Sequence, residues 1–232
     1  MTIYITLALL FGFFIESIFG FAGSIISLAI LGFFVDIKTL VTLILYVSTV
    51  ASLLVVSTDL SSFSKKEYFS MAKLAIPGAI IGALLFNYLS SEALLKILAI
   101  FLLGLGFKSF FEPKLKSNFK NLLLFISGII HGVFGLGGVV AIGTMKNSLA
   151  NKSQVRVTFA IFFITLNFIR AIQYLIQSTV DTTEIIKFWW IPAPLYCAIW
   201  LGHKVHLKIS EHLFKKGISI LLLTSGIFFL LG

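Results

Sequence analysis

Long apolar stretches alternate with short polar ones along the whole chain. Eight apolar segments can be distinguished, over residues 2–35, 37–57, 68–89, 93–111, 119–145, 155–178, 184–201 and 212–231. A helix needs about 20 apolar residues to cross the hydrocarbon core of a bilayer. The pattern therefore predicts an all-α polytopic membrane protein in which the polar stretches are connecting loops.

The composition agrees with this prediction. Hydrophobic residues make up 59% of the 232 and charged residues 12%, and the mean hydropathy is +1.07. The net charge of +9 raises the alternative of a nucleic-acid partner. In a polytopic protein, however, an excess of Lys and Arg is explained by loops on the cytoplasmic side. We therefore expect a lipid bilayer as the surroundings, a multi-pass location in the cell (inner) membrane and no nucleic-acid partner.

The positive residues indicate how many times the chain crosses. Three Lys residues lie in loops that contain few positive residues. Fourteen Lys and Arg residues lie in or beside the four stretches that follow the second, fourth, fifth and seventh segments, so these stretches are rich in positive charge. If every segment crossed once, the rich stretches would be divided between the two sides, against the positive-inside rule. If the first and fifth segments are hairpins that return to the side they entered from, all four rich stretches are cytoplasmic. Both termini then lie outside.

This topology divides the chain into two repeats within one integral membrane domain. Residues 1–112 form the first repeat, 113–118 a linker and 119–232 the second repeat. Each repeat holds a hairpin and three crossings, an odd number, so the two repeats are inverted relative to each other. Residues 2–35 as one straight helix would be about 50 Å long, against a hydrocarbon core of about 30 Å. This length favours a broken, re-entrant hairpin.

Glycine clusters mark the tips of both expected hairpins. Residues 125–146 contain a G-x-G-G cluster, and residues 14–31 contain a degenerate copy. Superposing the two clusters places Glu16 opposite His131, one turn before each tip. Interrupted helices in inverted repeats are typical of the binding sites of secondary transporters. The alternative is that the glycines only permit close packing between helices.

These residues resemble the sulfite exporter TauE/SafE family of membrane transporters. The first motif reads Gly20-Phe21-Ala22-Gly23, and the second reads His131-Gly132-Val133-Phe134-Gly135-Leu136-Gly137-Gly138, close to the family's HGxxGxGG form. Residues 156–160 and 167–170 also resemble the segment that follows the second motif. The first motif is eroded at Ala22 and Ser24, and the proline that often follows each motif is missing. The resemblance implies movement of small sulfur-containing anions, such as sulfite or sulfonates, across the cell membrane.

We expect the two tips to form an anion site near the bilayer midplane. The helices that start there present unpaired N–H groups and the positive end of the helix dipole, which bind oxyanions without a basic side chain. The expected substrate-binding residues are Gly20, Gly23, Ser24, His131, Gly135, Gly137, Gly138, Asn167 and Arg170.

Two of the candidate residues leave alternatives open. Ionisable side chains at membrane depth are expensive, so Glu16 and His131 are candidates for proton coupling. The equal alternative is a structural contact of Glu16 with His131 or with Arg170. For Arg170 itself, the alternative to a substrate-attracting cation is a side chain that snorkels to the outer interface.

The sequence thus predicts a secondary transporter of a small, sulfur-containing anion that works by alternating access, with proton coupling as a hypothesis. The alternative is a passive anion channel, or a permease for another small organic anion. The segments contain no HExxH, GxSxG or paired-Asp motif, so we expect no enzyme activity. The single Cys197 offers neither a disulfide nor a metal cluster, and no cofactor or metal is expected. The oligomeric state is left open.

Overall fold

The structure is a computed structural model that describes residues 2–19, 22–111, 119–145, 148–149, 152–177, 182–205 and 211–231. The expected linker at 113–118 and the candidate residue Gly20 lie outside these ranges. The regular elements in them are helices: α1 (Thr2–Phe19), α2 (Gly23–Leu31), α3 (Ile37–Thr58), the 3-10 helix η1 (Leu60–Ser62), α4 (Lys65–Tyr88), α5 (Ser91–Phe111), α6 (Lys120–Phe134), α7 (Gly137–Met145), α8 (Lys152–Ile176), α9 (Thr182–Ile186), α10 (Pro192–Val205) and α11 (Glu211–Leu231).

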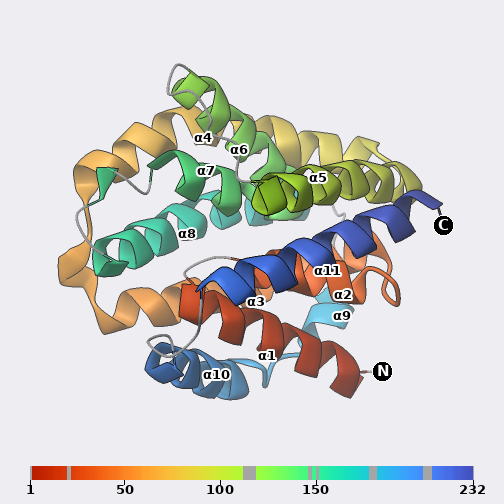
Figure 1. Ribbon diagram of the computed structural model, residues 1–232, viewed down its shortest axis with the longest axis horizontal. Coiled ribbons are helices and arrows are strands. Elements are labelled where there is room, and N and C mark those ends of the chain that lie inside the picture. Colours follow the sequence, from red (N-terminus) through yellow and green to blue (C-terminus); the bar gives the residue numbers. More distant parts are fainter. Residues whose placement is uncertain are drawn as a thin grey trace.

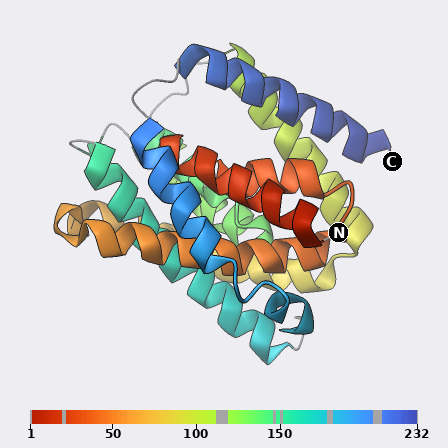
Figure 2. The ribbon, with the colours of Figure 1, turned by 90° about the horizontal axis from the view of Figure 1, so that it is seen from below.

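The helices are packed side by side into one body (Figure 1). α4 lies along α6, and α3 lies against α8. α11 runs along α5 and α10 packs against α1, as the second view also shows (Figure 2). The chain begins and ends at the same end of the molecule, and the turn from α3 through η1 into α4 lies at the opposite end (Figure 1).

The expected all-α polytopic architecture is confirmed for the described residues. Three helical stretches are long and apolar enough to cross a membrane, namely Ile37–Ser57, Lys65–Tyr88 and Ser153–Ile176, and shorter apolar helices accompany them. Large apolar side chains remain exposed on the outside, among them Ile80, Ile81 and Leu84 of α4. Such a surface suits contact with lipid rather than with water.

The first apolar segment is broken into two helices. α1 ends at Phe19 and α2 begins at Gly23. Between them, Ala22 has a φ of 92°, a left-handed conformation that is rare for residues other than glycine. α2 then packs back along α1, because Gly12 of α1 lies directly against the backbone of Gly23 and the side chain of Ser27. This segment therefore folds as a helical hairpin.

The fifth apolar segment is broken in the same manner. α6 ends at Phe134, and Gly135 follows with a φ of 77°, where glycine is the residue that costs least. α7 starts at Gly137 and packs back on α6 so closely that a Cβ on Gly137 would collide with the carbonyl oxygen of Ser127. The second glycine cluster therefore also lies at the turn of a helical hairpin.

Close packing, rather than the turn, explains two glycines of the fifth segment. A Cβ on Gly128 would collide with the carbonyl oxygen of Ala75 in α4, and a Cβ on Gly132 would collide with that of Ala79. Small residues on both helices thus let the α4 and α6 backbones approach each other, as in other membrane helix pairs. For these two positions the packing interpretation of the glycines is correct.

Candidate functional site

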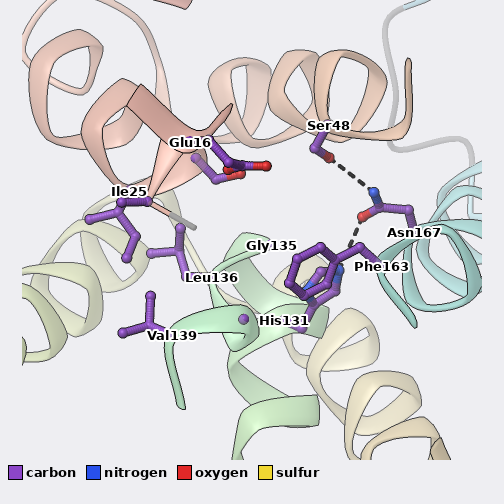
Figure 3. A pocket seen from close by; sticks show the side chains of 12 residues that line it. Glu16, Ile25, Ser48, His131, Gly135, Leu136, Val139, Phe163 and Asn167 are labelled. Carbon is purple, nitrogen blue, oxygen red and sulfur yellow. Dashed lines mark hydrogen bonds between the residues drawn. The ribbon is translucent and has the colours of Figure 1, made fainter. Parts of the chain in front are cut away.

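A small cavity lies between the turns of the two helical hairpins (Figure 3). Its lining residues come from both hairpins and from α3 and α8, and they are Glu16, Ala22, Ser24, Ile25, Ser48, His131, Gly135, Leu136, Gly138, Val139, Phe163 and Asn167. Its volume is about 30 Å³, enough for two or three water molecules at roughly 10–15 Å³ each. Two glycine motifs more than 100 residues apart in the sequence therefore meet around one cavity.

The N-terminus of α2 is already occupied by a carboxylate. Oε2 of Glu16 accepts a hydrogen bond of 2.9 Å from the backbone N–H of Gly23. A Cβ on Gly23 would lie only 2.6 Å from that oxygen, so a glycine is needed for this approach. The first amides of a helix lack partners within the helix and carry its positive dipole end, which favours a negative group there. The side chain of Glu16 supplies a hydrogen-bond acceptor at this terminus.

His131 belongs to a chain of three polar side chains across the cavity (Figure 3). Its Nε2 lies 3.0 Å from Oδ1 of Asn167, whose Nδ2 donates to Oγ of Ser48 at 2.9 Å. An amide oxygen only accepts hydrogen bonds, so Nε2 of His131 carries a hydrogen. Nδ1 of this buried ring has no hydrogen-bond partner among the described residues. It is an acceptor in the neutral ring and a donor in the protonated one.

The N-terminus of α7 differs from that of α2. Within the described ranges, no side chain accepts a hydrogen bond from the amides of Gly137 or Gly138. The aromatic ring of Phe163 lies over this end, because a Cβ on Gly138 would be 2.5 Å from its Cζ. The same ring stacks on His131, with centroids 5.7 Å apart and planes 12° apart. Phe163 therefore covers both the helix terminus and the histidine.

Arg170 lies behind the turn between α6 and α7. A Cβ on Gly135 would be 2.8 Å from its Nη1, and its Nη2 donates to the hydroxyl of Tyr174 at 3.3 Å. The side chain is fully buried, and its Nε and Nη1 have no hydrogen-bond partner among the described residues. A snorkelling arginine would reach the surface, and this one does not. It is not among the residues that line the cavity and instead places a positive charge beside the turn.

The structure brings most of the expected site residues together. The cavity is lined by Glu16, Ser24, His131, Gly135, Gly138 and Asn167. Gly23 and Gly137 lie within the hairpins behind the lining. In the described part of the chain, Glu16 forms an ion pair with neither His131 nor Arg170. Its carboxyl group instead accepts a hydrogen bond from the backbone of Gly23.

Sequence reasoning missed two lining residues with chemical consequences. Phe163 precedes Asn167 by one helical turn, so the spacing on α8 alone places both side chains on the same face. The sequence does not single out Ser48 in the same way, because α3 contains several Ser and Thr residues and nothing in their spacing shows which one faces a cavity. Its neighbour Thr49 bonds to the carbonyl oxygen of Leu45 within the helix instead.

Comparison with known protein families supports this description. A family model described as sulfite exporter TauE/SafE matches residues 4–229. The searches of curated proteins and of solved structures gave no match. Because the family match spans nearly the whole chain, the protein belongs to the sulfite exporter TauE/SafE family of membrane transporters.

Proposed function

We propose that the protein is a secondary transporter that moves a small sulfur oxyanion, of the sulfite or sulfonate type, by alternating access. Family membership supports the class of substrate. The observation that carries the proposal is the cavity between the two hairpin turns, which is lined by Gly138 at the start of α7 and by His131, whose Nδ1 has no hydrogen-bond partner among the described residues. Oxyanions bind at helix N-termini of this kind.

A repeated contact supports the interpretation of the fold as two inverted repeats. A Cβ on Gly82 of α4 would collide with the carbonyl oxygen of Ile129 in α6. A Cβ on Gly202 of α10 would lie 2.7 Å from the carbonyl oxygen of Phe14 in α1. Phe14 precedes Ile129 by 115 residues, the offset that also superposes the two glycine motifs. Inverted repeats place the substrate at their interface, which is where the cavity lies.

The anion binds at the start of α7 in this mechanism. The amides of Gly137 and Gly138 supply donors, the hydroxyl of Ser24 supplies another, and the buried charge of Arg170 lies close behind. The ring of Phe163 lies over this helix end, so the anion reaches these amides when the ring moves aside. Water leaves as the anion enters, which strengthens each remaining electrostatic interaction.

Two ionisable residues give the site its means of proton coupling. A proton on Nδ1 of His131 turns an acceptor into a charged donor that faces the anion. A charged Glu16 opposes the anion, and protonation of its carboxyl group removes that repulsion. Protonation of either residue strengthens binding of the anion, and binding of the anion in turn favours protonation. The proton and the anion therefore cross the membrane together in this mechanism.

The proposed orientation places the Lys-rich loops in the cytoplasm. Lys65 and Lys66 begin α4 and Lys152 begins α8, at the end of the molecule away from the chain termini (Figure 1). By the positive-inside rule this end faces the cytoplasm, and both termini face outwards.

The purified protein in proteoliposomes tests the proposal. We expect sulfite uptake that saturates with concentration and that an imposed pH gradient accelerates. Thermal unfolding in detergent is followed in parallel with sulfite, thiosulfate, sulfoacetate and taurine, with acetate as the carboxylate control. Stabilisation by acetate alone overturns the substrate class. Uptake that is linear in sulfite and indifferent to the pH gradient overturns coupled transport and indicates a passive anion channel.

A further inference from the structure

A second cavity adjoins the first. Its volume is about 40 Å³, and it is lined by Phe13, Glu16, Ser17, Ala51, Ser52, Val55, Arg156, Phe159, Ala160, Phe163 and Ile199. Glu16 and Phe163 line both cavities. These two side chains therefore form part of the wall between them.

The second cavity is directed toward the end of the molecule that carries η1. Ser52 and Val55 belong to the last two turns of α3, and Arg156 belongs to the second turn of α8. Both helix ends lie away from the chain termini (Figure 1). A path from that end to the central cavity thus passes Arg156 first and Phe163 last.

Arg156 gives this path a positive charge at its outer part. The charge of Asp59 acts on Arg156, and Asp59 in turn accepts hydrogen bonds from Ser61 at 2.8 Å, from Ser62 at 2.6 Å and from Ser153. The loop after α3 is therefore tied to the start of α8 beside the guanidinium. The arginine side chain is half-buried, so it faces the cavity while it remains within reach of water.

Phe163 is held in the wall by aromatic contacts. Its ring stacks on His131, and its centroid lies 5.8 Å from those of Phe159 and Phe162. Each of these ring contacts is individually weak, so rotation of the ring has a modest cost. Since the ring lines both cavities, its rotation opens the wall between them.

We propose that the second cavity is the cytoplasmic vestibule of the transport path, that Arg156 is a first binding site for the anion there, and that Phe163 is the gate between vestibule and central site. This inference rests on the proposed transport function. It assigns to Arg156 and Phe163 roles in access, which are separate from the binding of the anion by α7 and His131.

Thiol labelling tests the vestibule in the full-length protein with Cys197→Ala as the background. Ser52→Cys lines only the second cavity, and Ser24→Cys lines only the central one. Both are treated with membrane-impermeant thiol reagents, one anionic and one cationic, in vesicles of either orientation. We expect Ser52→Cys to react only when the face with the Lys-rich loops is exposed to the reagent. Reaction of Ser52→Cys only from the opposite face overturns the vestibule.

Substitutions at the two proposed access residues complete the test. We expect Arg156→Gln to slow the anionic reagent at Ser52→Cys by about tenfold while the cationic reagent keeps its rate, and Arg156→Lys to retain the wild-type rates. Equal effects of Arg156→Gln on both reagents overturn the binding role of Arg156.

The gate has its own control. We expect Phe163→Ala, or Phe163→Leu if the first variant does not fold, to speed labelling of Ser24→Cys several-fold from the cytoplasmic face. Phe162→Ala is the matched control, because Phe162 is a buried ring of the same helix that lines neither cavity. Equal acceleration by both variants overturns the gate. Stabilisation of the Cys197→Ala protein by sulfite is measured separately, so a failure of substrate binding is distinguished from a failure of the vestibule.

Discussion

The carboxylate of Glu16 caps the helix that begins at Gly23, with 2.9 Å between Oε2 and the backbone nitrogen. The corresponding helix in the second half, α7, begins beside His131, and no described side chain caps it. Two helix termini related by their glycine motifs are therefore chemically different. One is capped by a side chain of the protein, and the other is the terminus at which we propose that the transported anion binds.

Replacement of Glu16 tests this division of roles. Glu16→Gln keeps an oxygen that accepts from Gly23 and removes the negative charge, so we expect the fold to persist and sulfite to bind about tenfold more tightly, equivalent to 1.4 kcal/mol. The pH gradient should then accelerate uptake less than in the wild type. Isothermal titration and proteoliposome flux measure the two effects. Glu16→Asp is the control that keeps the charge, and weaker sulfite binding in Glu16→Gln than in Glu16→Asp would contradict the assignment.

The hydrogen bond between His131 and Asn167 gives a second prediction. Asn167→Ala leaves the buried Nε2–H of His131 without an acceptor, which costs about 1–3 kcal/mol of unfolding free energy. We expect a lower thermal midpoint and weaker stabilisation by sulfite, because the ring is no longer held in place. Thr49→Val serves as the control, since its hydroxyl bonds only to its own helix. If Thr49→Val lost as much stabilisation by sulfite as Asn167→Ala, the hydrogen-bonded series of His131, Asn167 and Ser48 would not be what supports sulfite binding.

The positions of the helix breaks were predictable because they depend on local sequence. Both segments contain a glycine cluster that is visible without the structure, and α1–α2 and α6–α7 break at those clusters. The first segment is also too long for one crossing, whereas for the fifth the distribution of positive residues and the match to the first segment indicated the break. The all-helical membrane architecture follows from apolar segments of spanning length. Superposition of the motifs was enough to place Glu16 and His131 near the same cavity.

The role of each glycine was not predictable, because it depends on the neighbouring helix. Gly132 faces α4 and Gly138 faces Phe163, although the two are six residues apart in one motif. Helical spacing shows which residues share a face and leaves open which partner that face meets. The burial of Arg170 has the same origin, since the turn at Gly135 and the ring of Tyr174 enclose it only in the folded protein.

The packing role of Gly132 gives a third prediction. In Gly132→Ala the added methyl group meets the carbonyl oxygen of Ala79, so α4 and α6 must separate at a cost of about 1–3 kcal/mol. Gly104→Ala in α5 is a matched control, because among the described residues no atom outside the surrounding turns of its own helix lies within 4 Å of the added carbon. We expect the control to keep or raise the thermal midpoint, since alanine is favoured over glycine inside a helix. Equal destabilisation by both substitutions would refute the close contact.

A fourth prediction concerns pH and the loop beside Arg156. Hydrogen bonds from Ser153, Ser62 and Ser61 lower the pKa of Asp59 to about 2. A depressed folded-state pKa stabilises the fold above the unfolded-state value of about 3.9, and this contribution is lost as the pH falls through the folded-state pKa. The thermal midpoint of the wild type should therefore exceed that of Asp59→Asn near pH 6, and the difference should shrink toward pH 2. A difference that is constant over this range would contradict the prediction.

The orientation in the membrane gives the last prediction. Lys66 and Ser153 are exposed at the end of the molecule where α3 ends. Glu92 in the first turn of α5 and Lys187 in the turn after α9 are also exposed, and the stretches around them carry few positive residues. Because positive loops are retained in the cytoplasm, single cysteines at Lys66 and Ser153 should react with an impermeant reagent only from the cytoplasmic side. Cysteines at Glu92 and Lys187 should react only from outside. The labelling is measured in intact cells and in inverted vesicles of the Cys197→Ala protein. If Lys66→Cys and Ser153→Cys reacted from opposite sides, the elements between them, α4 to α7, could not have the proposed number of crossings, and the two-hairpin topology would be wrong.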